Sequence, residues 1–121
     1  MTFQEVCNDL NLDNTPDWGI INSDSSRVAE FIKYISMNDL LDRRIQFEFI
    51  ELIIASMNDA IIDGIVTCEL YASFYNYIKP ILKDERLYPQ VQYWISIKSR
   101  DEFLVGYLLE KYEEEDRREI A

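Results

Sequence analysis

Residues 45–63 decide the fold, and they read IQFEFIELIIASMNDAIID. At helical spacing, Ile45 and Phe49 begin one apolar stripe, and Ile50 and Ile54 form its neighbour. The stretch is too long for a strand, because it shows neither alternation nor a turn signal. A helix that is apolar over most of its circumference needs neighbours on several sides. The stretch therefore predicts a buried helix in the middle of a helical bundle.

The residues outside this stretch predict further helices and their ends. Gly64 stands where a left-handed C-cap favours glycine, and Thr67 suits the N-cap of the next helix. Pro80 is expected to kink or end that helix, and Pro89 suits the first turn of the following one. Ser99 begins a capping-box pattern. With these signals, the apolar spacing predicts helices over residues 2–11, 25–37, 68–82, 89–98 and 100–118.

The predicted fold is an all-α bundle of five to six helices around the central helix. By its length, the chain 1–121 is expected to form a single domain. Residues 1–23 are predicted to form an acidic N-terminal helix and loop, and residues 113–121 a solvated C-terminal end. The pattern leaves open whether residues 39–63 form one bent helix or two.

The charge balance narrows the kind of partner. Twelve lysines and arginines against 23 aspartates and glutamates give a formal net charge of −11 and a pI near 4.3. Such a chain repels phosphate backbones and anionic membrane surfaces, so we expect no binding to nucleic acid or membrane. It attracts a basic protein at long range. A role in solubility alone would also account for the acidity.

The cysteines and the N-terminal residues bear on location. Cys7 and Cys68 occupy apolar-facing positions of predicted helices, which predicts two reduced thiols in the core. The segment 1–5 has neither a basic start nor an apolar stretch, so no secretory signal is expected. No apolar run approaches the roughly 20 residues of a membrane span. These features predict a cytoplasmic protein.

Few residues in the chain support catalysis. The sequence contains no histidine, which removes the commonest general base and most catalytic zinc sites. Carboxylate pairs on the central helix, Glu48 with Glu51 and Asp59 with Asp63, leave one enzymatic alternative, an Mg²⁺-dependent hydrolase. The ordinary interpretation of these acids is a solvated strip on a buried helix. We therefore predict a protein that is not an enzyme, with no catalytic residue, no metal and no cofactor.

Tyrosines and acids together make up the predicted contact surface. Tyr71 and Tyr75 fall away from the core stripe of their helix. A tyrosine buries a large area at low entropic cost and keeps a polar tip, which suits a protein-binding surface. The same rings would also fit half-buried beneath a loop. The predicted partner-binding residues are Asp13, Asp17, Asp24, Asp59, Asp63, Tyr71 and Tyr75.

The chain as a whole resembles a known class of small proteins. The segment Glu51–Ile61 followed by Gly64–Thr67 looks like a helix–turn–helix signature within a small, acidic, helical chain that has exposed tyrosines. This character is similar to that of bacterial immunity proteins, which neutralise bacteriocins or contact-dependent-inhibition toxins. The resemblance implies a basic toxin domain as partner, often a nuclease, bound by electrostatic steering and a few aromatic anchors. The acids would then mimic the phosphates of the toxin's substrate.

A second hypothesis from a different class stays open. The chain would also suit a helical adaptor or regulatory subunit that binds its partner through an apolar groove. Salt distinguishes the two hypotheses, because an interface of opposite charges weakens as salt rises whereas an apolar groove does not. The identity and activity of the partner and the oligomeric state do not follow from the sequence.

Overall fold

The computed structural model describes residues 1–38 and 42–120, and within them the chain is all-α, as predicted. Seven helices occur among the described residues, and no strand does. The predicted count of five to six missed α2, a four-residue helix inside the expected N-terminal loop. The helices are α1 (Phe3–Leu10), α2 (Trp18–Ile21), α3 (Val28–Ser36), α4 (Arg43–Asp63), α5 (Cys68–Leu82), α6 (Tyr88–Ser96) and α7 (Val105–Ile120).

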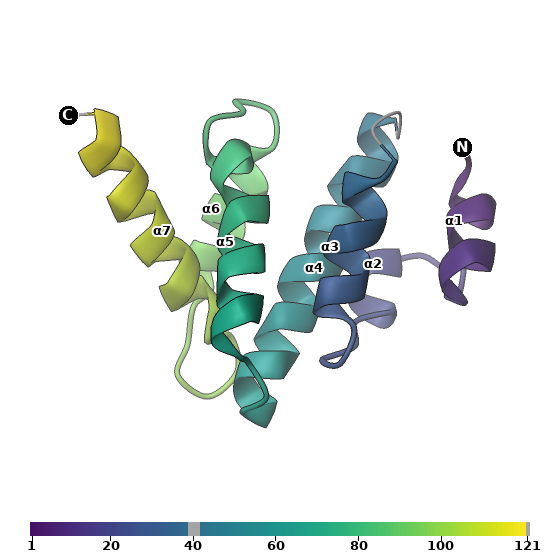
Figure 1. The fold of residues 1–121 in the computed structure, drawn as a ribbon, viewed down its shortest axis with the longest axis horizontal. Helices are drawn as coiled ribbons and strands as arrows, with labels where there is room; N and C mark the ends of the chain where they lie inside the picture. Colours follow the sequence, from purple (N-terminus) through teal and green to yellow (C-terminus); the bar gives the residue numbers. More distant parts are fainter. Residues whose placement is uncertain (39–41, 121) are drawn as a thin grey trace.

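The predicted central helix is α4, and its burial is confirmed. Its side chains Phe49, Leu52 and Ile53 are fully enclosed, and it packs against α2, α3 and α7. The Asp42 side chain caps its start by accepting the Ile45 N–H. The question of a bend near residue 39 lies outside the described residues, since 39–41 are not among them. Figure 1 shows α4 in the middle of the molecule, with α1 at one end and α7 at the other.

Both ends of the α4–α5 connection follow the sequence prediction. Gly64 adopts the left-handed conformation at φ 68°, and its N–H bonds to the Ala60 and Ile61 carbonyls. The Thr67 hydroxyl accepts the Leu70 N–H, which caps α5. Pro80 does not end that helix, because α5 continues for two residues beyond it to Leu82.

A buried tryptophan helps to fasten the N-terminal segment to the bundle. Trp18 is buried, contacts Phe3 and Phe49 with its ring, and donates its indole N–H to the Cys7 sulfur at 3.0 Å. Tyr34 of α3 adds a second tie, since its hydroxyl lies 2.8 Å from an Asp9 carboxylate oxygen. Burial is the larger cause and the bond to the Asp9 carboxylate the second, and together they raise the pKa of Tyr34 to about 12.

The start of α7 departs from the predicted capping box. The Ser99 hydroxyl accepts the Glu102 and Phe103 N–H groups, but these residues form a turn and the helix begins only at Val105. The Val105 N–H is bound instead by the side chain of Asn58 in α4, at 3.0 Å. The N–H group at the start of α7 is therefore capped by a side chain of a distant helix and not by the local serine that the sequence pattern predicted.

One further expectation, that both cysteines are buried, was wrong. Cys7 is buried as predicted, whereas Cys68 is exposed. Cys68 is the first residue of α5, and the chain around it from Gly64 to Glu69 is largely exposed, so its position on the apolar face does not bring it into the core. The segment from Glu113, predicted as a solvated end, has exposed side chains at residues 114, 115 and 117–119. In the structure α7 stays helical, and Asp116 pairs with Lys83 of the α5–α6 connection at 3.6 Å.

Candidate functional site

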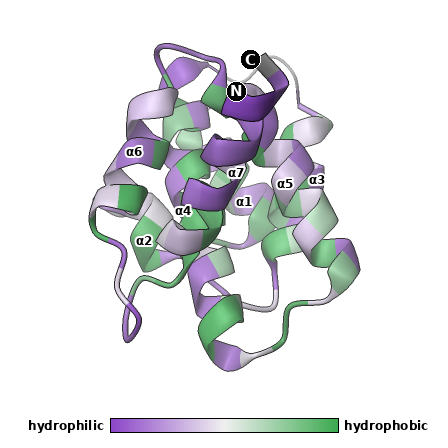
Figure 2. Cartoon of the chain, turned by 90° about the vertical axis from the view of Figure 1, so that its left-hand side faces the viewer, coloured by the Kyte–Doolittle hydropathy of each residue, from purple (hydrophilic) through white to green (hydrophobic). Residues whose placement is uncertain are grey.

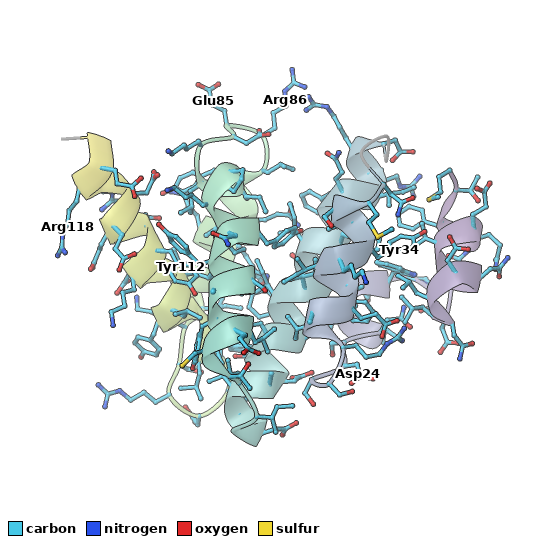
Figure 3. All side chains as sticks on the ribbon, in the orientation of Figure 1. Asp24, Tyr34, Glu85, Arg86, Tyr112 and Arg118 are labelled. Atoms are coloured by element: carbon cyan, nitrogen blue, oxygen red, sulfur yellow. The ribbon has the colours of Figure 1, made fainter. Side chains whose placement is uncertain are left out.

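The acids predicted from the sequence do different things in the structure. The Asp24 carboxylate accepts the backbone N–H and the hydroxyl of Ser26, and these bonds lower its pKa. Its own N–H donates to the Ser56 hydroxyl of α4 at 3.0 Å. Figure 3 shows Asp24 at the lower edge of the molecule, in the connection between α2 and α3. Asp24 therefore helps to fasten this connection to α4.

The other four predicted acids are spread over two regions. Asp13 is exposed. Its backbone N–H donates to the Asn22 side-chain oxygen, and its carbonyl accepts from the Asn22 side-chain nitrogen. Asp17 is exposed directly before α2 and has the left-handed conformation at φ 57°. Asp59 is half-buried and Asp63 is exposed, both in the last two turns of α4. The prediction that they share one surface with Asp13 and Asp17 stays a prediction.

The two predicted tyrosines differ in exposure. Tyr71 is exposed and lines a groove beside α7. Tyr75 is half-buried, and its ring meets the Tyr112 ring edge-on at 4.8 Å, so it follows the alternative of packing against a neighbour. Figure 3 shows Tyr112 pointing from α7 toward α5. Of the pair, Tyr71 is the ring that is free to meet a partner.

A groove between α2, α4 and α6 combines acids with exposed apolar side chains. It has a volume of about 460 Å³, and we call it the acidic groove. Figure 2 shows α2 and α6 along the same side of the molecule, next to α4. Its lining residues are Asp17, Gly19, Ile20, Phe47, Glu48, Glu51, Pro89, Gln90 and Tyr93.

Gly19 sets the distance between two walls of the acidic groove. A Cβ added to Gly19 would lie 2.7 Å from the Glu51 Cβ and 2.8 Å from the Glu48 carbonyl oxygen. Contacts this short do not occur between real side chains, so only glycine lets α2 approach α4 this closely. The close approach places Asp17 on the same groove as Glu48 and Glu51.

Glu51 is the most deeply placed carboxylate of the acidic groove. Its Oε2 atom accepts the indole N–H of the buried Trp94 at 3.2 Å. Burial raises the pKa of Glu51, while the bonds from Trp94 and Gln90 act in the opposite direction and the charge of Glu48 raises it further. A partly desolvated carboxylate interacts more strongly with a cation than a fully solvated one does.

Gln90 lines the same groove as Glu51, and its side-chain oxygen is a hydrogen-bond acceptor without a donor among the described residues. Its side chain is 4% exposed, and its Nε2 atom donates to the Phe47 carbonyl at 2.9 Å. That bond fixes the orientation of the amide. Its Oε1 atom is buried and has no hydrogen-bond partner among residues 1–38 and 42–120. A buried acceptor without a donor is uncommon and costs free energy, which favours a ligand that supplies the donor.

The charge of the acidic groove is not neutralised by its own residues. Among the described residues that line it, none is a lysine or an arginine. None of the ion pairs formed within residues 1–38 and 42–120 includes Asp17, Glu48 or Glu51. The nearest base along the chain is Arg44, which shares an adjoining hollow with Glu48 and lies over the Phe3 ring at 5.8 Å. The groove therefore presents uncompensated negative charge.

Exposed apolar side chains border the same acids. Ile20, Phe47 and Tyr93 are 55%, 45% and 57% exposed, although each is large and apolar or aromatic. Large side chains that gather on one exposed groove are typical of interaction sites.

A second groove lies between α4, α5 and α7, and five of its nine lining residues are apolar or aromatic. Its volume is about 640 Å³, and we call it the apolar groove. Its charged residues balance, with two bases and two acids. Tyr107 is 39% exposed there. The lining residues are Ile61, Tyr71, Arg100, Leu104, Tyr107, Leu108, Glu110, Lys111 and Glu114.

The carboxylates of the hydrolase alternative are separated along α4. Glu48 and Asp59 lie eleven residues apart, which is roughly 16 Å along a helix axis. Within residues 1–38 and 42–120, no three histidine, cysteine, aspartate or glutamate side chains are grouped so that they could hold a metal ion. In the same residues, no helix combines the length and the apolar character needed to cross a membrane.

Comparison with other proteins adds no assignment. No family model, characterised protein or solved structure matches the chain. The candidate site therefore depends on its own geometry.

Sequence reasoning missed most of the acidic groove. Of its residues, only Asp17 was among the predicted contacts, and Glu48 and Glu51 were considered as metal ligands. A usable signal was present, because Phe47 lies directly beside Glu48 in the sequence. The apolar character of Phe47 alone favours burial, so the pattern groups it with the core and not with the polar strip.

Proposed function

We propose that this protein binds and neutralises a basic protein partner, with a bacterial toxin as the most concrete case. In this role it acts in the cytoplasm as an immunity protein, and a nuclease is the type of toxin that an acidic surface suits best. The observation that carries the proposal is the acidic groove, where three carboxylates that form no ion pair within residues 1–38 and 42–120 border exposed apolar side chains.

The two parts of the groove suit two stages of binding. The net charge of −11 attracts a basic protein from a distance and raises the rate of association. Ile20, Phe47 and Tyr93 then supply apolar area, which slows dissociation. A nuclease carries positive charge where it binds phosphates, so the carboxylates of the groove match its active-site surface.

The first experiment is a pull-down from the source cell and its close relatives at low and at high salt, with mass spectrometry of the retained proteins. We expect a basic protein that is held at low salt and weakened as salt rises. A partner that is retained equally at low and at high salt, or a partner that is acidic, contradicts the proposal.

Charge-matched variants then locate the interface. The double variant Asp17→Asn and Glu48→Gln removes two charges from the groove, and asparagine tolerates the left-handed conformation of residue 17. The control, Asp101→Asn with Glu115→Gln, removes two exposed charges elsewhere. We expect the groove variant to weaken binding about tenfold more than the control. Equal effects would mean that only the net charge matters and would place the interface elsewhere.

The residues predicted from the sequence have their own test. Asp59→Lys with Asp63→Lys reverses two charges at the end of α4, away from the groove. If these positions are part of the contact surface, partner affinity falls and its salt dependence weakens. Unchanged affinity and salt dependence would remove Asp59 and Asp63 from the surface.

The apolar groove supports a second candidate function, that of a helical adaptor. Its balanced charges and the exposed Tyr71 and Tyr107 suit a partner held by apolar contact. In this case binding is insensitive to salt and is lost in the variant Tyr71→Ser with Tyr107→Ser. A partner that still binds this variant but fails to bind the acidic-groove variant, Asp17→Asn with Glu48→Gln, would exclude the adaptor function.

A further inference from the structure

The acidic groove has a surplus of hydrogen-bond acceptors over donors. Glu51 receives N–H groups from Trp94 and Gln90 and still has acceptor positions left, because an ionised carboxylate offers about four. Among the described residues, the Gln90 Oε1 atom has no hydrogen-bond partner, and Asp17 and Glu48 add two carboxylates that form no ion pair. A ligand that satisfies this site is therefore a cation with several N–H donors.

We propose that the acidic groove is a pocket for an arginine side chain of the partner, with the guanidinium bonded to the Glu51 carboxylate and the Gln90 Oε1 atom. The inference depends on the proposed function, because it names the chemical group by which a basic partner is recognised. Phe47 and Tyr93 provide apolar and aromatic surface beside that group.

Three properties favour arginine over lysine. A guanidinium carries five donors in a planar fork, so one group reaches two acceptors on different residues. It is less strongly hydrated than an ammonium ion, which lowers the cost of meeting the partly desolvated Glu51. Its flat face also stacks on aromatic rings such as Tyr93.

The Gln90 oxygen requires a small movement in this binding mode. The atom has no contact with solvent, so a donor reaches it only when the amide or a neighbouring side chain moves outward. The free energy of the new bond favours this movement, because an unsatisfied buried acceptor gains its first partner. Glu51 has already lost part of its hydration and needs no comparable change.

The two indole N–H groups provide an assay with an internal control. Trp94 donates to Glu51 in the groove, whereas Trp18 donates to the Cys7 sulfur beneath α1. In an ¹H–¹⁵N spectrum each tryptophan gives one indole signal. The protein is titrated with the capped tripeptides Gly-Arg-Gly, Gly-Lys-Gly and Gly-citrulline-Gly, where citrulline has the shape of arginine without its charge.

We expect the arginine peptide to move the Trp94 signal saturably, with a dissociation constant on the order of 1 mM, and to leave the Trp18 signal in place. The lysine peptide is expected to bind about tenfold more weakly, and the citrulline peptide not to bind. Glu51→Gln keeps an oxygen for Trp94 and is expected to abolish the response. Tyr93→Ser changes an exposed residue and is expected to weaken it several-fold.

Three outcomes overturn the inference. They are no movement of the Trp94 signal up to about 20 mM arginine peptide, an equal response to lysine or citrulline, and a full response in Glu51→Gln. Failure of the proposed function is distinguishable from these. A basic partner whose binding needs Asp17 and Glu48 but survives replacement of its own arginines by lysine refutes the arginine pocket alone. A saturable arginine response in a protein that retains no basic partner refutes the function alone.

Discussion

Replacing Asn58 with alanine tests the contact that fixes the start of α7. Asn58 lies in α4 and is 6% exposed. Its Oδ1 atom accepts the Val105 N–H at 3.0 Å, and its Nδ2 atom donates to the Glu102 carbonyl at 2.7 Å. The variant Asn58→Ala therefore removes both partners of a buried helix terminus at once.

The size of the effect follows from these two bonds. A buried donor or acceptor that loses its partner costs about 1–3 kcal/mol. The Val105 N–H is buried, whereas water reaches the exposed Glu102 more easily, so the first loss dominates. Alanine is a better helix former than asparagine and returns roughly 0.6 kcal/mol. We expect Asn58→Ala to lower the free energy of unfolding by about 2–3 kcal/mol.

Urea denaturation and amide hydrogen exchange measure this effect globally and locally. The midpoint in urea is expected to fall with an unchanged m value, and the Val105 amide is expected to exchange faster. The control is Asn76→Ala, at an exposed position of α5, where we expect a change within about 0.5 kcal/mol.

Two results would refute the reasoning about Asn58. One is a stability of Asn58→Ala within about 0.5 kcal/mol of the unmodified protein. The other is an equal loss in Asn58→Ala and Asn76→Ala, since the effect would then come from helix propensity and not from the bonds to α7.

Three further predictions concern the groove and the thiols. Gly19→Ala is expected to cost about 1–3 kcal/mol, because its Cβ meets the α4 backbone, and an unchanged melting temperature would contradict this. Burial raises the pKa of Glu51, so the contribution of Glu51 to the free energy of unfolding increases as pH falls through that pKa. At pH 7 the Glu51→Gln variant is therefore expected to be more stable than the unmodified protein. A less stable variant would refute burial as the cause of the pKa shift. Cys68 is expected to react rapidly with a thiol reagent in the folded protein and Cys7 only on unfolding, whereas equal rates would refute the burial difference.

The elements with strong local signals followed from the sequence. The apolar stripes of residues 45–63 require burial wherever the helix lies, and Gly64 and Thr67 mark their positions by backbone conformation and a side-chain bond to the next turn. These are interactions over a few residues, so a single sequence contains both partners. The prediction of an all-α fold with α4 at its centre required no more distant information.

The exposed faces did not follow in the same way. Phe47 and Ile20 have the apolar character of core residues, yet both are exposed on the acidic groove. Whether an apolar residue is covered depends on how many neighbours surround that arc of its helix. Periodicity identifies the apolar arc but gives no count of neighbours.

The sequence by itself determined the fold class, the central helix, the acidity and most helix ends. Only the tertiary structure decided that Asn58 caps α7, that Cys68 is exposed, and that Asp17, Glu48 and Glu51 share a groove with Gln90. Each of these depends on contacts between residues far apart in the chain. Such contacts are fixed by how closely helices approach, as at Gly19, and no local pattern contains that distance.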